Sequence, residues 1–318
     1  MQERTIELRQ LRYFVRIVDL GSLSRAAGVL HVAQSALSHQ VAALETELKS
    51  TLLNRNSRGV SATEAGQHLY RHAQAILKQA DDARDAVLSC SSAPSGQVGL
   101  GLPLSLAPSF ALPIFNELRV RYPAIRLQLY EALSGTILEW LKSGRLTLGV
   151  VFDEGNLEGL DCVRVMEERL FLVVHPRSAL ARRKLVTLRE LQGIELMLPD
   201  RDHGVRQCVE RAMLKEGLAP PTVMADMNSL TLMKQAVAAN LAATVLPWSG
   251  VEAELQGRQL VALEIARPAI TRVAAVCASA ATPHSRAADC ALNAAVLAIR
   301  ATLRQAAWRG LRSLATPA

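Results

Sequence analysis

The chain lacks the residue patterns around which disulfide scaffolds and structural metal sites are built. It has 5 cysteines in 318 residues, an odd number, and none of them belongs to a Cys-x-x-Cys pair. Disulfide frameworks normally use an even number of cysteines, and zinc knuckles need closely spaced pairs of ligands. We therefore expect neither a disulfide scaffold nor a structural metal ion, and the sequence calls for no cofactor.

The motifs of common enzyme families are absent as well. The run GQVGLGLP has its glycines in the wrong order for a dinucleotide site, and no P-loop or Gly-x-Ser-x-Gly elbow occurs. His68 and His72 are four residues apart, but two ligands make a weak metal site, and a solvated helix face explains them more simply. We therefore do not expect an enzyme.

Signals for export or membrane insertion are also missing. The first ten residues, MQERTIELRQ, are too charged for a signal peptide, and the charge-free segment 86–116 is interrupted by prolines and serines. We expect a cytoplasmic protein that does not enter the membrane. Its net charge of +7 and pI of about 9.5 suit a nucleic-acid partner.

Residues 34–48 have the pattern of an amphipathic helix with one small, polar face. Leu37, Val41, Leu44 and Leu48 recur at spacings of four, three and four, so they share one side of a helix. Small side chains on the other side can enter a major groove and exchange hydrogen bonds with base edges. These outward residues are Ser35, Ser38, His39 and Ala42.

Two further helices are expected before this one, at about 22–30 and over an apolar stripe that begins at Leu8. Ser22 follows Gly21 and is a candidate N-cap of the second helix. Three short helices with tight connections are the minimal helix-turn-helix unit. Periodicity alone leaves open a three-helix structural subdomain that binds no ligand.

The residue strings favour the DNA-binding interpretation. The run LRQLRYFVRIVDLGSLSRAAGVLHVAQSALSHQVAALETEL, followed by NRNSRGVSATEAG, resembles the winged helix-turn-helix of LysR-type transcriptional regulators. It is most similar to the nitrogen assimilation control group of that family. The resemblance implies a regulator that binds promoter DNA sequence-specifically and activates or represses transcription, with RNA polymerase as a further partner. The matching positions include Phe14, Ser22, Ala26, Ala27, Leu30, Gln34, Ala36, Leu37, Leu44, Glu45, Arg55, Thr63 and Gly66.

Some positions depart from the family pattern. Ala33 stands where a capping Ser is usual, Ser35 where Pro is common, His39 where Arg or Gln is usual, and Lys49 where Gly is typical. An Ala cap is worth about 1 kcal/mol less than a Ser cap, so packing must stabilise the start of the helix. These departures concern the target sequence rather than the DNA-binding role.

A basic hairpin is expected over 55–63, with Gly59 at its bend. As a wing it would place Arg55 and Arg58 on phosphate groups, which fix the register on DNA without reading its sequence. A solvated loop is the alternative. The predicted DNA-binding residues are Ser22, Gln34, Ser35, Ser38, His39, Arg55 and Arg58.

A long helix is expected from residue 63 to about residue 90, with an apolar repeat close to that of a two-helix seam. About 27 residues at 1.5 Å each span about 40 Å, enough to separate two DNA-binding heads. Packing of this stripe on the chain's own C-terminal domain is the alternative. The predicted dimerisation residues are Leu69, Ala73, Ile76, Ala80, Ala83 and Val87.

After a Ser-, Pro- and Gly-rich linker, the remaining chain alternates short apolar runs with helical segments. Strands are expected at 98–102, 125–130, 146–152, 170–175, 194–198, 223–226 and 242–246, with helices at 108–122, 134–143, 205–217 and 229–240. Such alternation predicts an α/β fold with a doubly wound, mostly parallel sheet. The resemblance implies two lobes, like a periplasmic solute-binding protein, and two chain crossings, near Arg164 and Arg267.

These patterns divide the chain into five parts. We expect a winged helix-turn-helix at 1–62, a linker dimerisation helix at 63–90, a hinge at 91–97, a two-lobed effector-binding domain at 98–301, and a basic tail at 302–318. Lobe 1 comprises 98–163 and 268–301, and lobe 2 comprises 166–266. The tail either touches DNA or a partner subunit, or is a solvated surface helix.

Ligands of open α/β sheets bind at the carboxyl ends of strands, near helix N-termini. Hydroxyl groups at helix starts, together with an arginine, would suit a small carboxylate or other anion. For each Ser or Thr an N-cap role is the alternative, and for Arg201 a surface ion pair. The predicted effector-binding residues are Ser105, Ser134, Thr136, Phe152, Arg201, Ser229 and Thr231.

Two functions from different classes remain open at this stage. The first is a transcriptional regulator that binds double-stranded promoter DNA as a homodimer or homotetramer and responds to a small effector. The second is a small-molecule receptor whose helical head only oligomerises it. The nitrogen assimilation group is thought to act without an effector, so the cleft of a regulator could also be empty in function.

Overall fold

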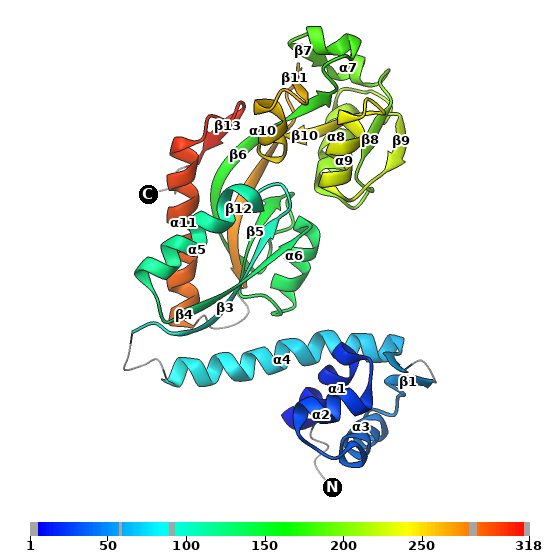
Figure 1. The fold of residues 1–318 in the computed structure, drawn as a ribbon, viewed down its shortest axis with the longest axis vertical. Coiled ribbons are helices and arrows are strands. Elements are labelled where there is room, and N and C mark those ends of the chain that lie inside the picture. The colour runs from blue at the N-terminus through cyan, green and yellow to red at the C-terminus, as the bar shows by residue number, and fades with distance from the viewer. Residues whose placement is uncertain (1–5, 57–58, 89–92, 280–284, 315–318) are drawn as a thin grey trace. The chain divides into compact units, whose positions relative to one another are not determined.

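The computed structural model describes residues 6–56, 59–88, 93–279 and 285–314. The chain forms two compact units, which Figure 1 shows as a helical head and a larger α/β body. The first unit contains residues 1–90 with 143–145, and the second contains residues 91–142 and 146–318.

The head consists of three short helices, a hairpin and one long helix. Phe14, Ile17, Leu37 and Leu44 are fully buried where the three short helices meet. The apolar spacing predicted the burial of Leu37 and Leu44 correctly, whereas Leu48, predicted on the same face, is exposed. The elements are α1 Leu8–Leu20, α2 Leu23–Leu30, α3 Gln34–Leu48, β1 Leu53–Asn56, β2 Gly59–Ala62 and α4 Glu64–Leu88.

Local hydrogen bonds fix the turns of the head. The Ser22 hydroxyl caps α2, accepting a hydrogen bond from the Arg25 N–H at 3.3 Å, whereas Ala33 at the start of α3 provides no side-chain cap. The Glu45 carboxylate accepts hydrogen bonds from the backbone N–H groups of Leu52 and Leu53 at 2.8 and 3.2 Å. This carboxylate ties α3 to β1, the first strand of the hairpin.

The α/β unit is built on a sheet that passes through both lobes. The sheet order is β4-β3-β5-β12-β6-β10-β8-β9, with β7, β11 and β13 beside this path. In lobe 1, β3 is parallel to β4 and β5, and in lobe 2, β8 is parallel to β9 and β10. The strands are β3 Gly96–Pro103, β4 Ile125–Ala132, β5 Leu148–Asp153, β6 Leu160–Val174, β7 Leu185–Thr187, β8 Leu196–Leu198, β9 Val223–Asp226, β10 Ala243–Pro247, β11 Val261–Ala266, β12 Thr271–Ser279 and β13 Leu311–Ser313.

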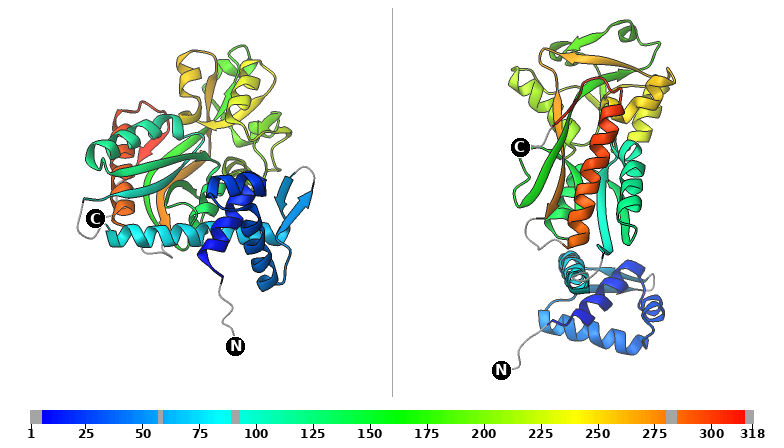
Figure 2. Two further views of the ribbon diagram at one scale, coloured as in Figure 1. Left: turned by 60° about the horizontal axis from the view of Figure 1, so that its bottom comes forward. Right: turned by 90° about the vertical axis from the view of Figure 1, so that its left-hand side faces the viewer.

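Helices cover each lobe. In lobe 1 the helices α5 and α11 lie side by side (Figure 2). The buried alanines of α11 allow close packing on the strands. In lobe 2 the core forms around Leu172, Leu198, Val209 and Met213. The helices are α5 Ala107–Arg121, α6 Ser134–Lys142, α7 Leu188–Leu191, α8 Gly204–Lys215, α9 Leu230–Ala238, α10 Trp248–Gln256 and α11 Arg286–Gln305.

Strand β6 is much longer than the expected strand at 170–175. Residues 160–169 pair with β12 in lobe 1, and residues 170–174 pair with β10 and β11 in lobe 2. The expected crossing near Arg164 therefore lies inside a strand rather than in a loop. The first half of β6 carries charged residues on its exposed positions, so it presents no apolar run.

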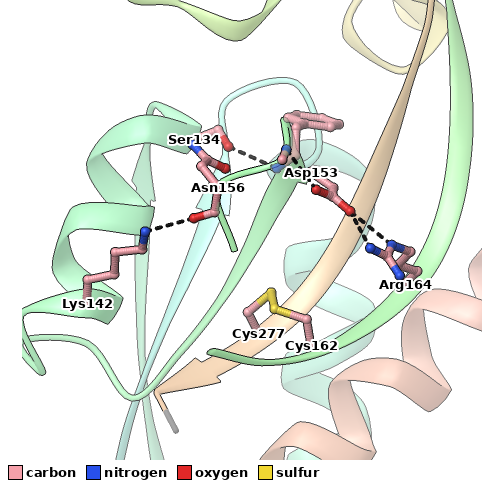
Figure 3. The surroundings of a disulfide bond; sticks show 9 residues. Ser134, Lys142, Asp153, Asn156, Cys162, Arg164 and Cys277 are labelled. Atoms are coloured by element: carbon pink, nitrogen blue, oxygen red, sulfur yellow. Dashed lines mark hydrogen bonds and ion pairs between the residues drawn. A yellow bond between two sulfur atoms is a disulfide. The ribbon is translucent and has the colours of Figure 1, made fainter. Parts of the chain in front are cut away.

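The described residues contain one disulfide, which the cysteine count did not indicate. Cys162 of β6 and Cys277 of β12 face each other directly in the antiparallel register, with their Cα atoms 4.2 Å apart, and they are bonded (Figure 3). Spacing could not reveal this pair, because 115 residues separate the two cysteines. Only the strand pairing brings them together. Cys208 and Cys290 are free, and Cys90 lies outside the described residues.

The expected basic tail is partly structured. The helix α11 continues to Gln305, and β13 pairs with β6. Arg309 and Arg312 form ion pairs with Glu264 and Glu167 at 3.0 and 2.6 Å. Among the helices of the described ranges, none combines the length and hydropathy that a bilayer crossing requires.

Candidate DNA-binding surface and effector cleft

The helix α3 presents the small polar face that its sequence predicts. Leu37, Val41 and Leu44 are fully buried beneath it. Gln34, Ser35, His39 and Ala42 are exposed, and Ser38 is half-buried. No side chain of this exposed face is larger than a histidine, so the helix surface can approach base edges closely.

The wing contacts the recognition helix directly. The strands β1 and β2 form an antiparallel hairpin in which Arg55 pairs with Val60. The Arg55 guanidinium donates a hydrogen bond from Nη1 to Ser38 Oγ at 3.0 Å. This contact places a cation beside the α3 face, where it can also reach phosphate. Arg58, the second arginine expected in the wing, lies outside the described residues.

The long helix α4 has two different faces along its length. Leu69 and Ala73 pack on Leu11 and Val15 of α1, and Ala73 is fully buried. Ala73 therefore has no surface left for a dimer seam, and Leu69 is half-buried against α1. The predicted seam residues that remain accessible are Ile76, Ala80, Ala83 and Val87.

A cavity of about 370 Å³ lies between the two lobes of the α/β unit. Four of the predicted effector-binding residues line it, namely Ser105, Ser134, Thr136 and Phe152. The Ser134 hydroxyl accepts a hydrogen bond from the Phe152 N–H at 2.9 Å, which joins the start of α6 to the end of β5. The carboxyl ends of the lobe 1 strands therefore form one wall of the cavity.

Three predicted effector-binding residues do not line the cavity. The Ser229 hydroxyl caps α9 by accepting a hydrogen bond from the Leu232 N–H at 3.3 Å. Arg201 and Thr231 are exposed and lie outside the set of cavity-lining residues. Their neighbours along the chain, Asp202 and Leu230, line the cavity instead.

The floor of the cavity holds a buried ion pair. Arg272 of β12 and Glu168 of β6 are directly opposite in the strand register, and their side chains are 4% and 5% exposed. The Arg272 guanidinium lies 2.6 Å from the carboxylate, donates a hydrogen bond to Ser105 Oγ at 3.0 Å, and stacks 3.5 Å from the centre of the Phe152 ring. The Ser249 hydroxyl donates to the second Glu168 oxygen at 2.9 Å.

The start of α8 forms part of the opposite wall. The ring of His203 caps this helix, with Nδ1 accepting a hydrogen bond from the Val205 N–H at 3.1 Å. Burial lowers the pKa of His203 to about 4, and the Arg272 charge acts in the same direction. Burial raises the pKa of Glu154, whose carboxylate lies against Gly204. His203 is therefore neutral at pH 7.

Both halves of the chain match known family models. Residues 8–67 match the bacterial regulatory helix-turn-helix of the lysR family, and residues 91–298 match the LysR substrate binding domain. The chain belongs to the LysR family of transcriptional regulators. Among its relatives is the nitrogen assimilation regulatory protein nac of Escherichia coli, 36% identical over 77% of this chain and 79% of that protein.

Other LysR-type proteins share the whole fold. The full-length OxyR variant of Pseudomonas aeruginosa superposes with a TM-score of 0.70 at 21% identity, covering 98% of this chain and 99% of that one. Full-length CbnR in complex with its target DNA gives 0.68 at 21% identity, covering 93% and 100%. A probable hydrogen peroxide-inducible genes activator of Mycobacterium leprae is 30% identical over 81% of this chain and 83% of that protein.

Sequence reasoning missed the charged residues of this LysR-type regulator's cleft. Glu168 stands in the charged first half of β6, before the predicted strand at 170–175, and Arg272 stands in β12, which the sequence analysis did not predict. A lone arginine within the apolar run TRVAAVCAS was the available signal for a buried ion pair. No signal in the sequence indicated that Glu154 reaches Gly204. None of the described residues form a group of His, Cys, Asp or Glu that could hold a metal ion.

Proposed function

We propose that this LysR-type regulator binds promoter DNA with α3 in the major groove and the β1–β2 wing on the phosphate backbone. The observation that carries the proposal is the exposed face of α3, with Arg55 held beside Ser38 at 3.0 Å. Gln34, Ser35 and His39 would read base edges, and Arg55 and Arg58 would fix the register. The protein would act on chromosomal DNA in the cytoplasm and would contact RNA polymerase where it activates.

The regulator would assemble as a dimer through the second half of α4. Ile76 and Val87 are 44% and 75% exposed, and Ala80 and Ala83 lie between them at helical spacing, so this face has apolar surface to cover. A second apolar face on α5, with Leu112 and Phe115 exposed, would join two dimers into a tetramer. Two heads related by a two-fold axis would bind a partly palindromic site.

The α/β unit would bind a small molecule in the cavity between its lobes. Support comes from the cavity itself and from the match to the LysR substrate binding domain. Of the described strands, only β6 belongs to both lobes, and Arg272 of β12 is paired with Glu168 of β6. A ligand that touches Arg272 therefore acts next to the strand that connects the lobes. The signal to the DNA-binding heads would be a change in lobe orientation.

Retention of genomic fragments tests the DNA-binding proposal. The full chain is incubated with sheared DNA of the source genome, washed with rising salt, and the retained fragments are sequenced. We expect enrichment of fragments that share a two-fold symmetric motif with half-sites about 10 bp apart, or a multiple of this spacing. Retention without a shared motif, lost uniformly as salt rises, would refute the proposal and favour a receptor whose head only oligomerises it.

A further inference from the structure

The cavity between the lobes has few places left for an anion. Its one lining arginine, Arg272, is already paired with Glu168 and bonded to Ser105. Its guanidinium also stacks on Phe152, which covers one of its faces. A carboxylate ligand would have to compete with a buried partner in the same chain, which a ligand rarely does at low cost.

The second natural anion position, the N-terminus of α8, is also filled. Glu154 comes from lobe 1, from the loop between β5 and β6, and its carboxylate lies against Gly204, the first residue of the helix. A Cβ atom at position 204 would stand only 1.9 Å from Glu154 Oε1, so a glycine is what makes room for the carboxylate. In the same turn, the Val205 N–H is already bonded to His203 Nδ1.

The remaining charged groups on the cavity wall are acidic. Glu139 comes from α6 of lobe 1, and Asp200 and Asp202 come from the loop before α8 of lobe 2. The Asp200 carboxylate accepts a hydrogen bond from the Asn228 side-chain amide. Within the described part of the chain, neither Glu139 nor Asp202 has an ion-pair partner. Arg201 stands between the two aspartates in sequence but does not line the cavity.

Apolar side chains also line the cavity. Leu133 of lobe 1 faces the same cavity as Met227, Leu230, Met233 and Leu246 of lobe 2. A cavity of about 370 Å³ is within the usual range for small-molecule sites, which is about 300–1,000 Å³. The walls therefore offer a hydrocarbon surface with negative charges on both lobes.

We propose that the cleft binds a small organic cation, an aliphatic ammonium compound, in preference to a carboxylate. This inference rests on the proposed effector role of the cleft and names the ligand's chemical class. The chain's own carboxylates, Glu168 and Glu154, occupy the two anion positions, and the free acids of the two lobes attract positive charge. The sequence alone favoured the opposite sign, because it showed the helix starts and not what fills them.

The proposal also gives the ligand a structural effect. Glu139 and Asp202 carry like charges on opposite lobes, and like charges across a cleft oppose its closure. An ammonium group between them replaces this repulsion with two attractions. Binding of the cation therefore favours the closed arrangement of the lobes.

Three probes of matched length test the charge preference. Pentane-1,5-diamine, glutaramide and glutarate each have five carbons and differ in charge, and isothermal titration of the full-length protein gives the Kd of each. We expect the diamine to bind at least about tenfold more tightly than the other two, which corresponds to about 1.4 kcal/mol. Asp202→Asn should weaken diamine binding about fivefold or more, whereas the matched surface variant Glu195→Gln should leave it unchanged.

A gain of function tests the role of Glu154. Glu154→Gln removes the charge at the α8 N-terminus, so glutarate should bind this variant about tenfold more tightly than it binds the unaltered protein. Glutarate binding to the unaltered protein as tightly as the diamine would overturn the proposal, and so would three equal or undetectable affinities. Fragment retention by the same preparations reports separately on the DNA-binding role, so failure of one conclusion is distinguishable from failure of the other.

Discussion

Arg272 and Glu168 form a buried ion pair between β12 and β6, the strand that connects the lobes. Their oppositely charged groups are 2.6 Å apart, and the two residues are register partners in the β12–β6 ladder. The pair sits where Ser105 and Phe152 bring lobe 1 to the cavity and where Ser249 brings in lobe 2. One charge pair therefore joins the lobes and forms the floor of the cleft.

We predict that loss of either partner of this pair is costly. Glu168→Leu leaves the Arg272 charge buried without its partner, and the free energy of unfolding should fall by about 3–5 kcal/mol in urea titrations. The double variant with Arg272→Met should lose clearly less than the sum of the two single variants. Strictly additive losses would show that the two side chains act independently.

The lowered pKa of His203 predicts a pH dependence of stability. The folded chain keeps this imidazole neutral down to about pH 4, whereas the unfolded chain protonates it near its ordinary pKa of 6.5. The contribution of His203 to the free energy of unfolding is therefore fully present above about pH 6.5, and it is lost as the pH falls to about 4. The largest change is about 3 kcal/mol, at about 1.4 kcal/mol for each unit of pKa.

The variant His203→Asn distinguishes the effect of protonating residue 203 from the effect of its helix-capping hydrogen bond. Asn can accept the Val205 N–H hydrogen bond but does not titrate, so the variant should match the unaltered protein at pH 7 and lose less stability at pH 4.5. Urea midpoints at the two pH values measure the difference. If the stability of the two proteins changed with pH in the same way, His203 would not be the cause of the loss of stability at low pH.

Base reading and phosphate binding should separate by mutation. His39→Ala should change the preferred sequence among selected fragments, because His39 lies on the exposed face of α3. Arg55→Ala should weaken binding to all DNA sequences alike. It should also reduce the slope of log affinity against log salt concentration by about one. Selection from a random library, followed by salt titration, measures both effects. Equal loss at every site in both variants would contradict this division.

Two substitutions on α4 should have different consequences. Ile76→Asp changes an exposed position, so we expect a folded chain that sediments as a monomer at concentrations where the unaltered protein is a dimer. Leu69→Asp places a charge against the α1 core and should lower the stability of the head by about 2–5 kcal/mol. If the Ile76→Asp variant still formed a stable dimer, the second half of α4 would not be the dimer interface.

The disulfide predicts a stability that depends on reductant. The Cys162–Cys277 bond closes a loop with a sequence separation of 115, and a bond of that span contributes about 2–5 kcal/mol. Reductant should lower the urea midpoint of the unaltered protein but not that of Cys162→Ser. The double variant Cys208→Ser with Cys290→Ser controls for the free thiols and should respond to reductant as the unaltered protein does.

Periodicity predicted much of the fold because it reports directly on burial. The apolar positions of α3 are spaced so regularly that Leu37, Val41 and Leu44 could be assigned to the core in advance. The strands β3, β4 and β9 were predicted within two residues at their start, since apolar residues begin at or near those positions. For α4 the same reasoning did not show that Leu69 and Ala73 pack on α1, because an apolar stripe does not identify its partner.

The sequence predicted only those cleft residues that directly follow a strand, because their position depends on the direction of that strand alone. Ser105 and Ser134 follow directly after strands of lobe 1, so their place at the carboxyl edge follows from topology. Arg272 and Glu168 meet across 104 residues of sequence, and their pairing depends on a register that no local pattern encodes. Long-range strand pairing therefore hid both the ion pair and the disulfide.

The continuity of β6 through both lobes limits how the lobes can move. The strand changes partners at residues 169 and 170, from β12 in lobe 1 to β10 and β11 in lobe 2, without a break in β6. Opening and closing would then bend a paired strand at this point and would not swing the lobes on a loose loop. A movement of the lobes that is transmitted through a continuous strand is therefore small, and its direction is fixed by the strand.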